Sequence, residues 1–179
     1  LHRGLKQMLE QVNLSRLSHG VRAAAMMRRC FGEASQVARH RVAFGRHLIE
    51  MPIVQTQLLE MLLPAEQALS MWLYTADVLD RAKSGDAEAS RLLRVLTPLI
   101  KLKACRDNIE VATAAMEMRG GNGYIEDWVN ARLVRDAHIG VLWEGTSNIV
   151  ALDLVTRAFA KDDGAAVLST ALSGILNET

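Results

Sequence analysis

The sequence predicts an all-α protein, an antiparallel four-helix bundle, on three observations. Apolar residues recur at spacings of three and four along four stretches of the chain, which is the period of an amphipathic helix. Hydrophobic residues make up 50% of the 179 residues, but only 4% are aromatic and only 3 are proline, a composition that favours helices. No stretch alternates convincingly between apolar and polar residues as a strand would. We therefore expect one helical domain with a core of its own.

The first two helices are predicted from long apolar stripes. One stripe occupies residues 14–38, and residues 1–13 before it read as a lead-in segment. The next occupies residues 54–79 and is followed by Ser-Gly-Asp at 84–86, which is a stop signal for a helix. Pro64 lies inside this second stretch, where a proline removes a backbone hydrogen bond, so we expect a kink there.

The remaining helices follow from the same periodicity. A third stripe covers residues 86–118, and after a glycine-rich loop and a short segment at 127–135 a last helix is expected over 146–159. Three long helices and this shorter one would form the bundle over residues 14–160. Residues 161–179 read as a tail cut from a longer chain, because its weak helical pattern has no evident partner.

The charge of the chain is small but unevenly distributed. A net charge of +1 at pH 7 argues against a general polyanion as partner. Residues 11–49, however, hold seven arginines and one acidic residue, Glu33. A face made of these arginines could bind phosphate groups, so DNA is kept as an alternative partner.

Cysteine usage and hydropathy indicate a cytoplasmic protein. Cys30 and Cys105 have neither the spacing of a metal site nor the density of a disulfide scaffold, so they read as reduced thiols. The first residues do not resemble a signal peptide, and no run of about 18 apolar residues could span a membrane. The five histidines show no ligand spacing, and we expect no metal site.

The most informative stretch for function is 142–149, Leu-Trp-Glu-Gly-Thr-Ser-Asn-Ile. It places a lone carboxylate, Glu144, directly ahead of a helix start, with Thr146 or Ser147 available as N-cap. Gly145 allows a close approach of the backbone. Such a carboxylate can abstract a proton. The plainer alternative is an acidic residue that only complements the helix dipole.

A second stretch, 115–124, ends a helical pattern in a loop with three glycines. At such a loop the backbone can approach a phosphate or a flavin closely. Taken alone it is an ordinary end of a helix. It is no dinucleotide fingerprint either, because no strand precedes it.

Three segments in this order resemble the C-terminal part of the acyl-CoA dehydrogenases: Gly-Gly-Asn-Gly-Tyr at 120–124, Arg-Asp-Ala at 135–137 and Trp-Glu-Gly-Thr-Ser-Asn-Ile at 143–149. The resemblance covers roughly residues 13–159 and is strongest to the bacterial branch that contains the alkylation-response flavoprotein. In this family a C-terminal four-helix bundle follows an N-terminal helical domain and a middle β domain. FAD lies between the domains and against a neighbouring subunit.

The resemblance implies a catalytic role for Glu144. In the family a glutamate at this place removes the α-proton of an acyl-CoA thioester, and Gly145 resembles a residue beside the substrate. Some members carry the base on the first bundle helix instead, where this chain has Ser15. Arg16 stands at the place of a family arginine that shapes the acyl-CoA site, and its alternative is a solvated helix arginine.

The resemblance also implies contacts to FAD. Arg41-Val-Ala-Phe44-Gly matches the family motif Arg-x-x-Phe-Gly, which touches the FAD of the other subunit. A guanidinium can bind two pyrophosphate oxygens, and Phe44 can pack on the flavin or the adenine. The alternative for Arg41 is a basic helix end that answers the helix dipole.

One position departs from the family pattern. Glu117 stands where most members have a glutamine that contacts the FAD pyrophosphate. A carboxylate there is repelled unless it is protonated or paired, and Arg119 or Arg41 could pair with it. The backbone of Gly121 can still contact the cofactor. Further flavin contacts are expected at the start of the last helix, from Thr146, Ser147 and Asn148.

The resemblance therefore implies an FAD-dependent α,β-dehydrogenation of a fatty acyl-CoA by a homodimer or homotetramer. Electrons would leave to an electron-transfer flavoprotein, as the resemblance implies. The alternative is a vestigial or non-enzymatic flavoprotein whose arginines bind DNA or a protein partner. A third possibility is a bundle that serves chiefly for oligomerisation.

Overall fold

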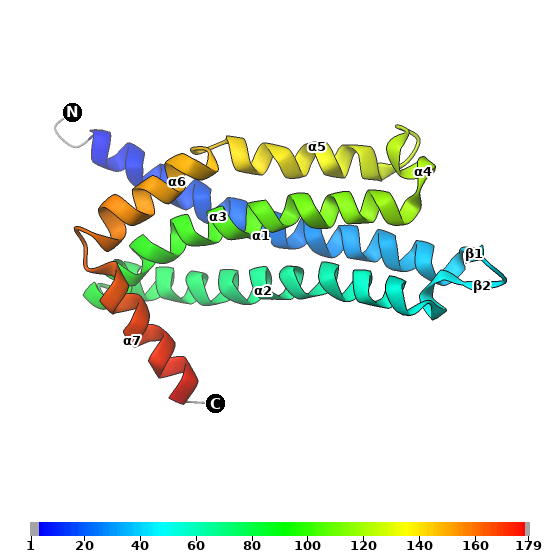
Figure 1. Ribbon diagram of the computed structural model, residues 1–179. Coiled ribbons are helices and arrows are strands. Elements are labelled where there is room, and N and C mark those ends of the chain that lie inside the picture. The colour runs from blue at the N-terminus through cyan, green and yellow to red at the C-terminus, as the bar shows by residue number, and fades with distance from the viewer. Residues whose placement is uncertain (1–3, 178–179) are drawn as a thin grey trace.

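Three long helices and one shorter helix form an antiparallel bundle in the computed structural model, which describes residues 4–177. The all-α fold class and the four-helix bundle are thus confirmed. The chain runs along the bundle four times in alternating directions (Figure 1). The four helices are α1 (Gly4–His40), α2 (Pro52–Lys83), α3 (Ala87–Arg119) and α5 (Val129–Leu142).

Short elements connect and extend the bundle. Two two-residue strands, β1 (Val42–Ala43) and β2 (Arg46–His47), form an antiparallel hairpin after α1, with Val42 opposite His47 and Ala43 opposite Arg46. The sequence did not predict these strands. The other connecting elements are the 3-10 helix η1 (Leu48–Glu50), α4 (Gly121–Tyr124), α6 (Ser147–Asp153), the π-helical η2 (Leu154–Phe159) and α7 (Gly164–Asn177).

The first helix is longer than the sequence predicts. It begins at Gly4, so residues 4–13, which were expected to be a lead-in, extend α1 by about three turns. Leu5, Met8 and Leu9 continue the helical spacing of α1, and all three are exposed. Residues 1–3 lie outside the described residues, as do residues 178–179 of the predicted tail.

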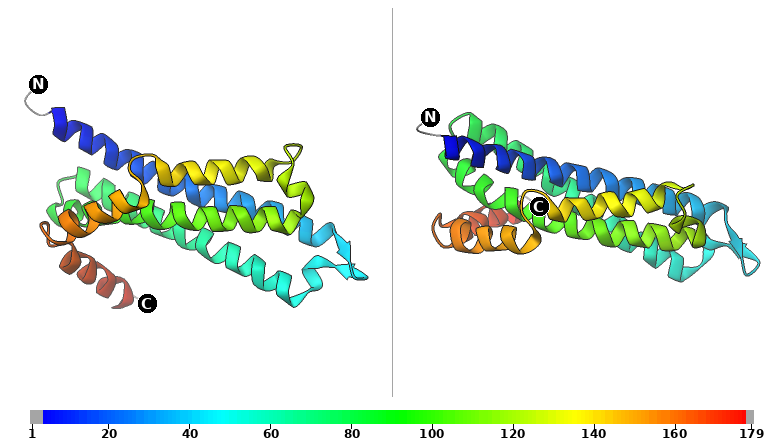
Figure 2. Two further views of the ribbon diagram at one scale, coloured as in Figure 1. Left: turned by 45° about the horizontal axis from the view of Figure 1, so that its top comes forward. Right: turned by 90° about the horizontal axis from the view of Figure 1, so that it is seen from above.

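The fourth side of the bundle is α5 rather than the helix predicted over 146–159. The sequence analysis expected only a short segment at 127–135, although Val129, Leu133, Ala137 and Val141 recur every four residues through α5. Small residues on its buried face allow close packing: a Cβ on Gly140 would lie 3.3 Å from Cys105 Sγ. Figure 2 shows α5 lying along α3 and α1 in both views, and residues of α5 contact both helices.

A helix is present where the last one was predicted. Thr146 occupies its N-cap, and α6 passes into η2 as far as Phe159. The tail then forms α7, which does find partners: Val167 packs with Val78 of α2 and Leu92 of α3 at one end of the bundle.

The main core lies between α1, α2, α3 and α5 and is rich in alanine and methionine, including Ala24, Met27, Met61 and Ala112. Both cysteines are buried, free thiols. Burial raises the pKa of Cys30 to about 12, which keeps it an unreactive thiol. Within residues 4–177 no helix has the length and apolar character needed to cross a membrane.

Candidate active site

Glu144 lies in the turn between α5 and α6, and its backbone adopts a conformation that is rare for a residue with a side chain. Its φ angle is +54°, and that of Gly145, which follows, is +97°. Left-handed backbone at a non-glycine residue is uncommon and is often found at functional sites. The turn presents a half-buried carboxylate between α1 and the start of α6.

Ser15 of α1 binds the carboxylate of Glu144. Its hydroxyl donates a hydrogen bond to Glu144 Oε1 at 3.0 Å, although the two residues are 129 positions apart in the chain. The two positions that the resemblance implies for the base, 15 and 144, are therefore neighbours in this fold. Of the two, only position 144 holds a carboxylate here.

Two buried cations bind the backbone of this turn. Arg16, of which 8% is exposed, donates from Nε to the carbonyl oxygen of Glu144 at 3.3 Å. Lys101 of α3, of which 1% is exposed, donates from Nζ to the carbonyl oxygen of Gly145. Burial lowers the pKa of Lys101 from its ordinary value. Sequence reasoning missed Lys101, whose only signal is its position four residues before Cys105 on the buried face of α3.

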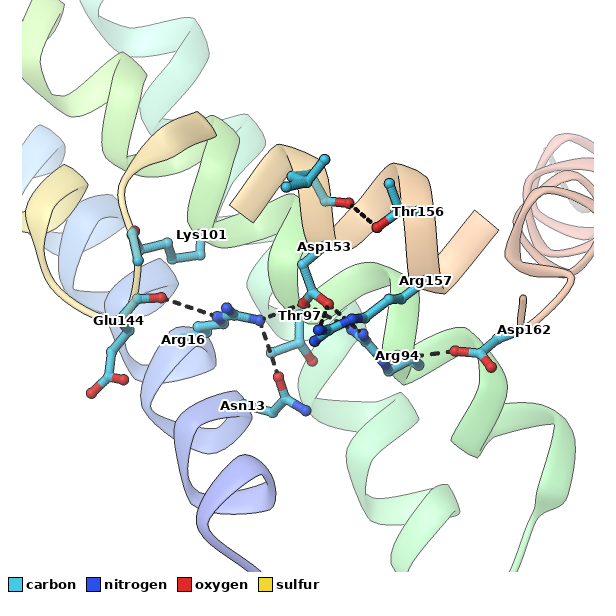
Figure 3. A network of polar contacts seen from close by, with 12 residues as sticks. Asn13, Arg16, Arg94, Thr97, Lys101, Glu144, Asp153, Thr156, Arg157 and Asp162 are labelled. Atoms are coloured by element: carbon cyan, nitrogen blue, oxygen red, sulfur yellow. Dashed lines mark hydrogen bonds and ion pairs between the residues drawn. The ribbon is translucent and has the colours of Figure 1, made fainter. Parts of the chain in front are cut away.

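Arg16 is in turn fixed by Asp153, the last residue of α6 (Figure 3). Its Nη1 lies 2.8 Å from Asp153 Oδ2, and Arg94 of α3 contributes a second contact of 2.7 Å to Oδ1. Burial favours the neutral form of Asp153, but the hydrogen bonds from Arg94 and Arg16 outweigh it and hold the pKa of Asp153 below its ordinary value. The sequence analysis did not single out Arg94 or a role for Asp153.

His19 and Trp143 border the same turn. Their rings meet edge to face with centroids 6.3 Å apart. Burial, reinforced by the charge of Arg22, lowers the pKa of His19, which favours the neutral imidazole. Trp143, which precedes Glu144, remains half-exposed, so its ring is placed to form a wall beside the carboxylate.

A second group of predicted residues gathers at the other end of α5, near the β1–β2 hairpin. Arg41 is exposed and donates from Nη1 to the carbonyl oxygen of Arg119 at 3.2 Å. A Cβ at Gly120 would lie 3.2 Å from the same Nη1, so a glycine there gives the arginine room. A pocket of about 620 Å³ includes Arg41, Gly121 and Trp128 in its lining. Phe44, 93% exposed, projects from the tip of the hairpin.

Glu117 is exposed, and the two arginines suggested as its partners bind elsewhere. Arg119 lies 2.6 Å from Glu33 and over the ring of Trp128 at 4.4 Å. The hydrogen bond of Arg41 goes to a backbone carbonyl. The pairing of Glu117 with Arg119 or Arg41 that the sequence suggested is therefore absent from the contacts of the described residues.

Thr146, Ser147 and Asn148 form the start of α6 as predicted from the sequence. Thr146 is the N-cap residue but makes no side-chain capping hydrogen bond. The three residues line a pocket of about 280 Å³ together with Arg106 of α3, a residue that the sequence analysis did not single out. A helix start and an arginine on one pocket make an environment that suits an anionic group.

Three of the seven arginines in the arginine-rich stretch 11–49 form ion pairs. Arg28 lies 2.5 Å from Glu66, and Arg29 lies 2.7 Å from Glu33. Arg16 is buried against Asp153. Within residues 4–177 no three His, Cys, Asp or Glu side chains gather as a metal site requires.

The fold and the site define a class of domain: a four-helix bundle that presents one carboxylate on a turn ahead of a short helix. Comparison with known proteins identifies the family to which this domain belongs. Residues 2–159 match the family model for the acyl-CoA dehydrogenase, C-terminal domain. The chain belongs to the acyl-CoA dehydrogenase family, a family of oxidoreductases.

Individual relatives agree with this assignment. Acyl-CoA dehydrogenase family member 11 of Caenorhabditis elegans is 32% identical over 88% of this chain and 26% of its own length. AidB of Escherichia coli is 33% identical over 90% of this chain and 29% of its own. The crystal structure of C. elegans ACDH-11 in complex with C11-CoA superposes with a TM-score of 0.93 at 27% identity, over 99% of this chain and 30% of that one. The chain thus spans less than a third of each of these relatives.

Proposed function

We propose that this chain is the C-terminal domain of an FAD-dependent acyl-CoA dehydrogenase in which Glu144 is the base that removes the α-proton of an acyl-CoA thioester. The observation that carries the proposal is the presentation of Glu144. A lone carboxylate is held on a left-handed turn, with Ser15 on one of its oxygens and a buried cation on its carbonyl group.

The local contacts suit proton abstraction. Ser15 binds Oε1 of Glu144 and so orients the carboxylate, which leaves Oε2 to accept a proton. The half-exposed ring of Trp143 gives the thioester an apolar wall. As the α-proton moves to Glu144, the bond to a β-hydrogen breaks and the double bond forms between the α- and β-carbons.

The residues present fit FAD in two places. At one end of α5, Arg41 and the backbone of Gly121 line a pocket that would accept a pyrophosphate, with Phe44 exposed nearby. At the other end, the start of α6 and Arg106 offer donors beside the base. The chemistry that FAD supplies when bound is acceptance of the β-hydride, and the electrons would pass on to an electron-transfer flavoprotein.

The residues at the two ends of α5 cannot both bind the same part of one FAD molecule. They flank α5, whose 14 residues span about 21 Å. A site shared between two copies of the chain, as in the family, accounts for both sets. We therefore infer a homodimer or homotetramer in which each copy contributes one set to each of two sites.

The alternative is a non-enzymatic flavoprotein whose arginine-rich stretch binds DNA or a protein partner. Two arginines of that stretch, Arg28 and Arg29, instead form ion pairs with Glu66 and Glu33. Ion pairing of this kind reduces the positive field that a nucleic acid would meet.

The proposal is tested with Glu144→Gln in the FAD-loaded protein. The amide keeps the shape of the side chain but cannot accept the α-proton, so flavin bleaching by an acyl-CoA should slow by at least about 100-fold while FAD and acyl-CoA still bind. Glu66→Gln, an exposed and ion-paired glutamate, serves as control and should bleach like the wild type. Equal bleaching by Glu144→Gln would remove Glu144 as the base. A wild type that no acyl-CoA bleaches would favour the non-enzymatic flavoprotein.

A further inference from the structure

We propose that Asp153 is a positioning residue that, through Arg16, fixes the turn on which Glu144 is presented. The inference rests on the proposed function only where Glu144 is taken as the base. Its structural part concerns side chains from α1, α3 and α6 (Figure 3): Arg16, Arg94 and Asp153 contact one another, and Lys101 binds the turn separately.

The turn needs support from outside its own backbone. Glu144 and Gly145 both have positive φ angles, which an isolated chain would seldom adopt at Glu144. The N-cap residue, Thr146, gives no side-chain capping bond that would hold the entry into α6. The carbonyl oxygens of Glu144 and Gly145 accept hydrogen bonds from the side chains of Arg16 and Lys101. Two buried charged donors thus hold the two peptide groups that define the bend.

Arg16 bridges the turn and Asp153 with different nitrogens of one planar group. Nε donates to the carbonyl of Glu144, and Nη1 donates to Asp153 Oδ2 at 2.8 Å. Because a guanidinium is rigid and planar, fixing Nη1 fixes the direction of Nε. The other contact of Nη1 is a long one, 3.4 Å to Asn13 Oδ1. Asp153 is therefore the partner that sets where Arg16 points.

Asp153 is itself anchored to α3, the central helix of the bundle. Arg94 binds both of its oxygens, Nη2 to Oδ1 at 2.7 Å and Nη1 to Oδ2 at 3.3 Å. The side chain of Asp153 is 11% exposed, so these charge-assisted bonds act in a sheltered place. A continuous line of contacts leads from Arg94 through Asp153 and Arg16 to the peptide group of Glu144. Arg157 is exposed, and its Nη1 lies 3.6 Å from Asp153 Oδ1, so it adds only a weak contact.

The test is Asp153→Asn in the FAD-loaded protein, with two readouts. Amide hydrogen exchange of the peptide over 142–149 should become faster, because the turn loses its support. The rate of flavin reduction at saturating acyl-CoA should fall by about 10- to 100-fold, as expected for a base displaced by about an ångström, with the acyl-CoA dissociation constant within about threefold. Asp107→Asn is the matched control: Asp107 is 14% exposed and ion-paired on α3, facing α2, and its loss should change neither readout.

A second variant separates this role from simple destabilisation. Arg16→Lys keeps a cation for Asp153 but has one nitrogen for the two acceptors that Arg16 joins. If Asp153 acts through Arg16, adding Asp153→Asn to Arg16→Lys should slow flavin reduction little further, whereas independent effects would multiply. Unchanged exchange over 142–149 in Asp153→Asn, or multiplying rate effects, would overturn the inference. If no acyl-CoA reduces the flavin of the wild type, only the proposed function is contradicted. Amide hydrogen exchange over 142–149 still tests whether Asp153 supports the turn.

Discussion

Lys101 has the lowest exposure of the charged side chains in the described chain, and the reason it is tolerated lies in its contacts. Taking an ammonium group out of water is costly unless it is hydrogen-bonded and has negative partners nearby. Nζ binds the carbonyl of Gly145, and the neighbouring carboxylate of Glu144 favours its charged form. Burial nevertheless outweighs these effects and lowers its pKa below the ordinary value of 10.5. Lys101 thus supports the turn that carries Glu144, but its burial lowers the stability of the fold.

This cost gives a pH-dependent prediction for Lys101→Met. Between the lowered folded pKa and 10.5, the unfolded chain holds a proton that the folded chain has lost, so stability should rise with pH in that interval. Below the folded pKa the full cost of the buried charge remains. Methionine has a similar length and no charge, so the variant should lack this rise. Urea midpoints followed by circular dichroism at increasing pH measure the difference. Lys103→Met, at an exposed neighbour, should keep the wild-type slope, and equal slopes for all three proteins would refute the account.

At the scale of an element, the hairpin that follows α1 combines an unfavourable turn with an exposed aromatic ring. Phe44 and Gly45 connect β1 to β2 with φ angles of +54° and +79°. Two positive angles in a two-residue loop are those of a type I′ turn, in which asparagine followed by glycine is preferred. A phenylalanine at the first position is strained and gains little from burial. Such a cost is expected where the ring serves a ligand or a partner.

Two substitutions separate the strain of Phe44 from its function. Phe44→Asn should stabilise the fold by about 1 kcal/mol, because asparagine tolerates the left-handed conformation. Phe44→Ala keeps most of the strain and should not stabilise. Both remove the ring, so both should release FAD more readily from the full protein if Phe44 packs on the cofactor. Urea titration and FAD release after gel filtration give the two measurements. Retention of FAD by both variants would assign the exposed ring to something other than the cofactor.

The three long helices of the bundle were predicted because their apolar stripes continue over many turns. The stripes on α1, α2 and α3 contain Met27, Leu58 and Leu92, and all three are buried. The extent of α5 was underestimated, although Val129, Leu133, Ala137 and Val141 recur at spacings of four within it. Hydrophobic periodicity indicates that a helix has an apolar face, whereas the close approach of Gly140 to Cys105 depends on how α5 and α3 pack.

At the scale of the whole molecule, the site joins residues that are far apart in the chain. Arg16 and Asp153 are 137 positions apart, and Lys101 and Gly145 are 44 apart. The sequence could place Glu144 because a local motif surrounds it. It could not pair Asp153 with Arg16 and Arg94, because those contacts depend on how α1, α3 and α6 cross. For the same reason it suggested a pairing of Glu117 with Arg119, whereas Arg119 binds Glu33 of α1.

The separation of the two cofactor sets along α5 makes the proposed sharing of FAD testable by mixing subunits. Arg41→Ala should weaken FAD binding by roughly 1.5 to 3 kcal/mol, the value of a charged hydrogen-bonded contact. Glu144→Gln should bind FAD but not carry out proton abstraction. If one subunit supplies Arg41 and the other supplies Glu144 to each site, a dimer of the two variants contains one intact site and one doubly altered site.

The mixed dimer, isolated by a different affinity tag on each chain, should therefore reduce flavin at about half the wild-type rate per dimer, although neither parent does so at the same FAD concentration. The matched control pairs wild type with a chain carrying both substitutions. It has the same number of altered residues, but each of its sites lacks either Arg41 or Glu144, so it should be nearly inactive. A site built within a single chain predicts the opposite, with activity in the control and none in the mixed dimer. The two arrangements are thus distinguished by which of two dimers of equal composition reduces the flavin.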